Sequence, residues 1–129
     1  MQKKLLFSPK DVQPHLRGGI VEGIINPAAV RLSNGKIVLI ARVAESHQYK
    51  YKNKLSCPII ISSKDSKIYY EKLDKKDILH KGKNLIVLRN GTCRLPTISH
   101  FVKITLDETG LIVENIEKKP YFHGIPNES

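Results

Sequence analysis

The sequence predicts an all-β fold of short antiparallel strands in about two four-stranded groups. Its strongest signal is a pair of apolar runs, residues 25–30 and 36–43, joined by an Asn34-Gly35 dipeptide. Asn-Gly between apolar runs is typical of a tight β-hairpin. Further short apolar or alternating segments, bounded by turn-forming residues, recur along the 129 residues. No convincing helical periodicity accompanies them, which favours an all-β chain.

The first group of strands is expected within residues 23–76, after an N-terminal arm of residues 1–22. Its hairpin covers about residues 28–45. Residues 58–63 form an apolar run typical of a buried strand, and residues 67–73 alternate well enough to be its antiparallel partner. These four strands would complete one small sheet.

The second group is expected within residues 77–119. After a connector with a single helical turn, a strand at 84–88 leads into an Asn-Gly turn. Residues 99–106 alternate as a strand, and residues 111–116 form its hairpin partner. A tail at 120–129 has no periodicity and would lie outside the sheets.

Two polar side chains mark one end of the first hairpin. Asn26 precedes its first strand, and Arg42 interrupts the apolar run late in its second strand. Because the strands are antiparallel, these positions lie at the same end, where an amide and a guanidinium can converge on a hydroxyl-rich or anionic ligand. Alternatively, Asn26 begins an Asn-Pro turn and caps local backbone, and Arg42 is an edge-strand arginine with an exposed head.

A second polar cluster comprises Arg94, Ser99 and His100. An imidazole at the start of a strand can serve as a hydrogen-bond partner or as a protonatable contact for phosphate. A partly buried histidine with satisfied hydrogen bonds is the competing interpretation. The remaining histidines are scattered without a carboxylate at ligand spacing, so no metal site is predicted.

Two segments carry a resemblance to a known family. The string NPAAVRLSNGKIVLIARVAE, residues 26–45, resembles the first blade of the five-bladed β-propellers of glycoside hydrolase family 130, the β-mannoside phosphorylases and related hydrolases. RLPTISHF, residues 94–101, and the turn at 107–110 resemble later parts of the same fold. Five blades of about 40 to 50 residues each exceed this chain. The resemblance therefore implies about two four-stranded antiparallel blades of a truncated five-bladed β-propeller.

The resemblance also implies a function on β-mannosides or related oligosaccharides. Asn26 would hydrogen-bond sugar hydroxyls, and Arg42 would reach the same pocket or an attacking phosphate. Arg94, Ser99 and His100 would add further substrate contacts. No cofactor is expected other than inorganic phosphate as a co-substrate.

The catalytic acid of the family has no counterpart in this sequence. It belongs to an acidic E-D-P-R motif, and the carboxylates present, Glu22 and Glu45 among them, are expected mostly in turns or Lys-rich surface segments. Inverting cleavage of a glycosidic bond needs such an acid. No catalytic residue is therefore assigned, and the chain is expected to be inactive alone. A downstream polypeptide or self-association would complete the propeller.

Positive charge is concentrated in one stretch. The chain carries a formal charge of +10, and residues 47–83 contain ten Lys against four acidic residues. This stretch is either a patch that attracts a polyanion or phosphate, or a solvated Lys-rich surface. Nucleic acid is not the expected partner, because no RNA- or DNA-binding motif is present. A small basic all-β binding or oligomerisation module with an anionic partner is the alternative function, and a non-functional gene remnant is the third.

Cysteine usage and hydropathy favour a cytoplasmic protein. Cys57 and Cys93 belong to no CxxC pair and are expected to be single buried thiols, with a buried pair as the alternative. The N-terminus lacks the pattern of a signal peptide, and no apolar stretch approaches the ~18 residues of a membrane span.

Overall fold

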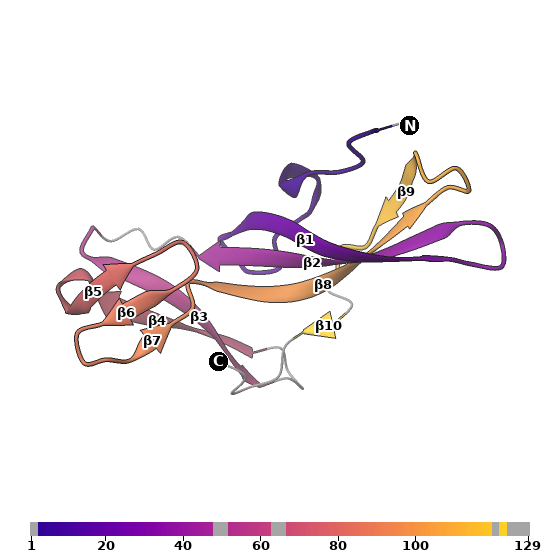
Figure 1. Cartoon of the computed structure of the whole chain (residues 1–129). Coiled ribbons are helices and arrows are strands. Elements are labelled where there is room, and N and C mark those ends of the chain that lie inside the picture. Colours follow the sequence, from indigo (N-terminus) through magenta and orange to yellow (C-terminus); the bar gives the residue numbers. More distant parts are fainter. Residues whose placement is uncertain (1–2, 48–51, 63–66, 120–121, 124–129) are drawn as a thin grey trace.

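The structure, a computed structural model, describes residues 3–47, 52–62, 67–119 and 122–123 (Figure 1). Strands dominate it, and the prediction of an all-β chain with antiparallel sheets is confirmed. Its elements are η1 (Pro9–Asp11), β1 (Gly19–Arg31), β2 (Ile37–His47), β3 (Lys54–Ser62), β4 (Lys67–Asp74), η2 (Lys75–Asp77), β5 (Ile78–Lys81), β6 (Ile86–Leu88), β7 (Cys93–Arg94), β8 (Thr97–Leu106), β9 (Val113–Ile116) and β10 (Phe122–His123). Neither short 3₁₀-helix in the described part of the chain has the length or apolar composition needed to cross a membrane.

The main sheet has the order β1-β2-β8, with β9 and β10 both pairing with the far edge of β8. The predicted hairpin joins β1 to β2. Gly35 adopts a φ of +86°, and the Lys36 backbone N–H donates to the Asn34 side-chain oxygen over 3.1 Å. A left-handed backbone at this position suits glycine, which explains the Asn-Gly signal.

One face of the main sheet, here called the inner face, packs against the N-terminal arm. Ala41 and Val43 of β2 lie beside Val102 and Ile104 of β8, and Val12 of the arm covers them. Alternate residues of a strand point to opposite faces, so these positions define the inner face and their neighbours define the outer face.

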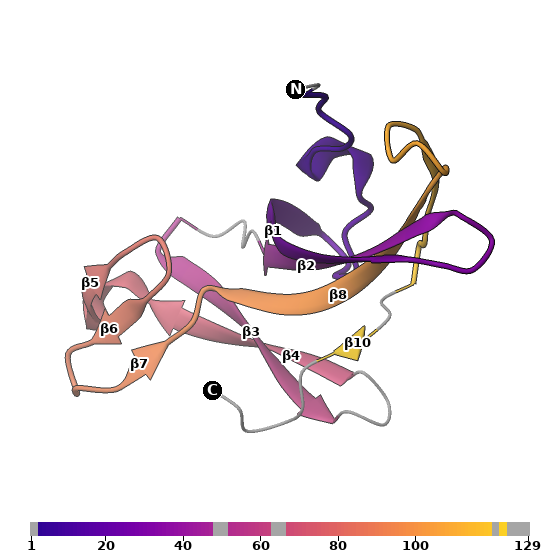
Figure 2. The same ribbon diagram turned by 45° about the vertical axis from the view of Figure 1, so that its right-hand side comes forward.

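The residues between β2 and β8 form a second unit, β3–β7. It contains the β3–β4 hairpin and the three-stranded sheet β5-β6-β7. Cys57, Leu73, Ile86 and Leu88 form its separate small core. Figures 1 and 2 show the short strands β5, β6 and β7 gathered at one end of the molecule, beyond the end of β2.

The strand pairing differs from the two groups expected within residues 23–76 and 77–119, because strands of the first group pair with strands of the second. β1 and β2 share no sheet with β3 and β4, and β2 instead pairs with β8 over ten residue pairs. In this register, inward-facing Ala41 meets Val102 and Val43 meets His100. Neighbouring strands in sequence usually pair, but a longer buried interface with a distant strand can override that tendency.

Local boundaries also differ from the expectation. β1 begins at Gly19, well before residue 28, and the helical turn expected at 77–83 is replaced by strand β5 after a 3₁₀ turn at Lys75–Asp77. Within the expected tail, Phe122 and His123 pair with β8, and the other tail positions lie outside the described residues.

Candidate functional site

Two of the predicted residues meet on the outer face of the main sheet. Arg42 of β2 is exposed, and its Nε donates to Ser99 Oγ of β8 over 3.0 Å. The register pairs Ala44 with Ser99 and Arg42 with Phe101, so the two polar residues are diagonal neighbours on one face. The non-local pairing of β2 with β8 therefore joins residues from two clusters that were separate in the sequence.

Asn26 occupies a β-bulge next to this pair. Ile25 pairs with Arg42 and Ala28 pairs with Ile40, which leaves Asn26 and Pro27 opposite Ala41. The exposed Asn26 has a φ of +50°, in the left-handed region that asparagine tolerates better than most residues. β-Bulges often change the direction of side chains next to binding sites. In this bulge Asn26 directly follows Ile25, the residue that pairs with Arg42.

A second bulge supplies a carboxylate that the sequence did not single out. The register of β1 shifts between Val21 and Gly23, and the intervening Glu22 accepts a short hydrogen bond from the Ser46 hydroxyl. Ser46 shares the outer face with Arg42, about 13 Å along β2 at ~3.3 Å per residue. Glu22, Arg42, Ser46 and Ser99 are called the outer-face strip below. No short-range signal marks Glu22, because its bulge exists only once β1 and β2 are paired.

His100 lies on the opposite side of the sheet from Ser99. Its side chain is 4% exposed, and its Nδ1 is 3.5 Å from Glu45 Oε1. The His15 ring lies 5.6 Å from the His100 ring, measured between centroids. Consecutive residues in a strand face opposite ways, so Ser99 and His100 do not form one site. His100 is therefore buried and faces away from Ser99.

Glu45 is fully buried, in contrast to the expectation of a turn or surface position. Its carboxylate accepts hydrogen bonds from the backbone N–H groups of His15, over 2.5 Å, and Leu16, over 2.9 Å. A Cβ on Gly19 would lie 2.7 Å from Leu16 Cβ and 2.9 Å from Glu45 Oε2, so glycine is needed where the arm turns past these atoms. Glu45 therefore anchors the N-terminal arm to β2.

Arg94 lies in the second unit, apart from the outer-face strip. Its Nε and Nη2 donate to the two carboxylate oxygens of Glu71 over 2.6 and 3.2 Å. This fork links β7 to β4. The hydrogen bonds to Glu71 raise the pKa of Arg94 above its ordinary value. The geometry gives Arg94 a structural contact between the two small sheets.

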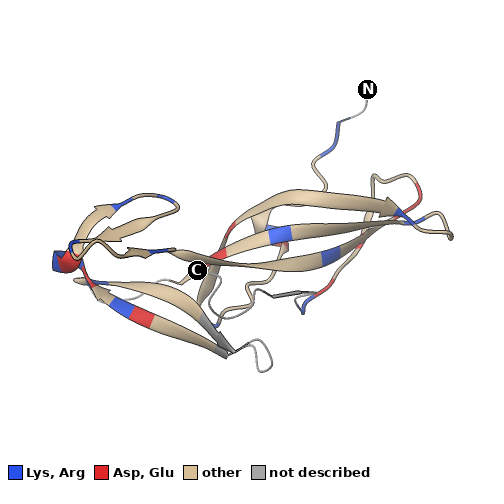
Figure 3. Cartoon of the chain, turned by 60° about the horizontal axis from the view of Figure 1, so that its bottom comes forward, with Lys and Arg blue, Asp and Glu red and all other residues tan. Residues whose placement is uncertain are grey.

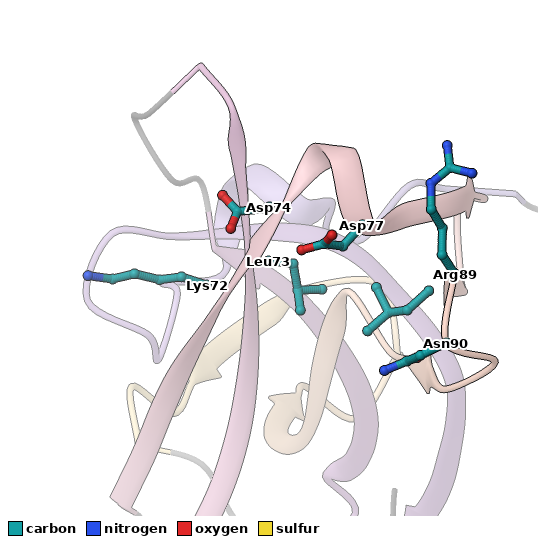
Figure 4. Close-up of a pocket in the computed structure, with 7 residues that line it drawn as sticks. Lys72, Leu73, Asp74, Asp77, Arg89 and Asn90 are labelled. Carbon is teal, nitrogen blue, oxygen red and sulfur yellow. The ribbon is translucent and has the colours of Figure 1, made fainter.

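A depression also lies in the second unit (Figure 4). It measures about 330 Å³, and none of the five predicted site residues lines it. Figure 4 shows the Asp77 carboxylate turned toward the hollow and the Arg89 guanidinium turned away. Asp74 also lines the depression, and its Oδ1 lies 3.7 Å from Lys54 Nζ. The residues that line it are Lys72, Leu73, Asp74, Asp77, Leu88, Arg89 and Asn90.

Comparison with known proteins identifies the fold. No protein-family model and no curated protein matches the sequence. A similar solved structure is the β-1,2-mannobiose phosphorylase from Listeria innocua in complex with β-1,2-mannobiose, with a TM-score of 0.78 and 20% identity. The match covers 94% of this chain and 35% of that chain. This chain therefore shares its fold with about a third of that larger protein, consistent with a propeller-like fragment.

Proposed function

We propose that the chain forms the saccharide-binding part of a β-propeller protein similar to glycoside hydrolase family 130, acting on β-linked mannosides or related oligosaccharides. The observation that carries the proposal is the Arg42–Ser99 hydrogen bond on the outer face. It brings together two residues from the two segments that resemble the family. The fold similarity to a mannobiose phosphorylase supports the same assignment.

The chemistry of the outer-face strip suits a ligand rich in hydroxyl groups. Glu22 offers carboxylate acceptors, Arg42 offers guanidinium donors, and the hydroxyls of Ser46 and Ser99 can donate or accept. Asn26, next to the strip, offers both in one amide. Arg42 also suits an oxyanion of inorganic phosphate, through charge-assisted hydrogen bonds. Phosphorolysis is therefore proposed alongside hydrolysis as the reaction of the complete protein.

The proton donor is proposed to come from a polypeptide outside these residues. Glu22 already accepts a hydrogen bond from Ser46, and Glu45 is buried beneath the arm. Among the described strands, β1 ends the main sheet and exposes the large apolar residues Ile25 and Val30. An exposed apolar edge strand favours association with another strand or sheet. Either a downstream polypeptide or a second copy is proposed to cover it.

Calorimetric titration with β-1,2-mannobiose tests the proposal, with and without inorganic phosphate. Binding is expected, and both Arg42→Ala and Ser99→Ala should weaken it by about tenfold, equivalent to about 1.4 kcal/mol. Thr105→Ala is the matched control, because Thr105 lies on the same face of β8 about 20 Å from Ser99. Absence of binding, or equal losses in all three variants, would contradict the assignment.

A further inference from the structure

The second unit holds most of the net positive charge of the molecule. Residues 54–94 contain ten of the 22 Lys and Arg but only four of the 12 Asp and Glu. Two of these acids are already paired, Glu71 with Arg94 and Asp74 with Lys54. Figure 3 shows Lys and Arg positions on both small sheets and at the turn between them. This half of the molecule is thus suited to an anionic partner.

Five of these cations gather around η2 and the β5–β6 hairpin. The Arg89 side chain donates to the Lys76 carbonyl oxygen over 2.8 Å, and its backbone N–H donates to the Asp77 carbonyl oxygen over 2.8 Å. These contacts hold the end of β6 beside η2. Asp74, the N-cap of η2, and Asp77, its last residue, are the acidic neighbours within this region. The cations are all exposed and are called the basic patch below: Lys75, Lys76, Lys81, Lys83 and Arg89.

Two cations of the basic patch border a hollow that is partly aliphatic. Lys75 and Lys81 line a depression of about 260 Å³ together with Leu55 and Ile78. Leu79, in β5, is 62% exposed. In such an arrangement the cations can contact acidic groups of a partner, and the aliphatic side chains can contact its apolar groups.

We propose that the basic patch binds an acidic polypeptide segment that also carries aliphatic side chains. Charge complementarity supplies the attraction, and the hollow floored by Leu55 and Ile78 accepts an aliphatic side chain. Binding of single-stranded nucleic acid without sequence preference relies on aromatic rings that stack on bases, and no aromatic residue lines this hollow among the described residues. This surface is distinct from the outer-face strip and independent of its proposed function.

Fluorescence anisotropy of the intact chain with a labelled peptide of Glu-Glu-Leu repeats tests this inference, without any sugar present. Binding is expected to weaken as salt is raised, because exposed charges are screened over about 10 Å at 0.1 M salt. The double variant Lys75→Glu with Lys81→Glu should bind about tenfold more weakly. The matched control, Lys10→Glu with Lys118→Glu, makes the same charge change at exposed sites outside the second unit and should change binding about twofold or less.

A second peptide of Glu-Glu-Ser repeats isolates the contribution of the hollow and should bind more weakly than the Glu-Glu-Leu peptide. Equal losses in the two double variants would overturn the inference, since they would show a response to overall charge alone. Tighter binding of oligothymidylate or of phosphatidylserine vesicles than of the peptide would overturn it as well. So would an absence of peptide binding at low salt.

Discussion

The main sheet and the second unit are built differently from strands of the same chain. The main sheet buries Ala41, Val43 and Ile104 completely along long strands whose pairing is non-local. The second unit has shorter strands, a smaller core around Ile86, and most of the excess positive charge. A rigid long-stranded sheet can hold polar groups at fixed spacing, as the recognition of a saccharide needs. A charged surface attracts a partner without such fixed geometry.

The two units meet at a polar contact between β2 and the β3–β4 hairpin. His47 Nδ1 lies 2.9 Å from Ser56 Oγ. The centroids of the His47 and Tyr70 rings are 4.1 Å apart. Burial, followed by the nearby charge of Glu45, raises the pKa of Tyr70. The junction thus relies on a few specific contacts, and the two cores are expected to respond separately to substitution.

Core substitutions test that separation and have the largest expected effect. Ile104→Ala should lower the free energy of unfolding by about 2–5 kcal/mol, because it removes a fully buried side chain from the main sheet. Ile86→Ala should instead loosen the second unit while the main sheet stays protected. Amide hydrogen exchange distinguishes the two cases. Loss of protection throughout both units in Ile86→Ala would show a single cooperative structure.

Removal of the Glu45 carboxylate should release the N-terminal arm from the main sheet. Glu45→Ala leaves the backbone N–H groups of His15 and Leu16 without their acceptor, at a cost of about 1–3 kcal/mol. Faster tryptic cleavage after Arg17 measures the release. Glu45→Gln keeps an acceptor oxygen and should retain part of the protection. Cleavage at the unmodified rate in Glu45→Ala would exclude the anchoring role.

The bulge in β1 predicts a difference between two substitutions at one position. Asn26→Ala should destabilise the fold by about 1–2 kcal/mol, because alanine disfavours a left-handed backbone. Asn26→Gly keeps that backbone and removes only the amide, so its stability should stay within about 0.5 kcal/mol of the parent. Thermal unfolding compares them, and saccharide binding by Asn26→Gly then isolates the contribution of the amide. Equal stability of the two variants would argue against the left-handed bulge.

Ionisation of the Cys57 thiol, in the core of the second unit, should have the smallest effect on stability, and this effect depends on pH. Burial, followed by the charge of Glu71, raises the pKa of the Cys57 thiol from 9.0 to about 11. Between these values the unfolded chain ionises Cys57 while the folded chain keeps it protonated, so stability falls as pH rises through this range. Cys57→Ala should show a smaller fall in stability between pH 8 and pH 10, measured by urea unfolding.

The two cysteines should also differ in reactivity. Exposed Cys93 should react with a thiol reagent well before buried Cys57.

Short-range patterns predicted the local elements better than their assembly. Asn34-Gly35 and the alternation of residues 99–106 correctly indicated a hairpin and a strand, because both depend on neighbouring residues. The pairing of β2 with β8 depends on burial between segments far apart, and no local pattern contains it. Glu22 was missed for the same reason. The alternation of residues 99–106 also implies that Ser99 and His100 face opposite ways, although both were predicted to belong to one polar cluster.

The most direct test of the saccharide-binding claim follows side-chain signals by nuclear magnetic resonance during titration with β-1,2-mannobiose. The Nε–H signal of Arg42, on the outer face, should shift, while the ring signals of His100 on the inner face should stay in place. Shifts of the His100 ring with an unchanged Arg42 signal would contradict the outer-face assignment.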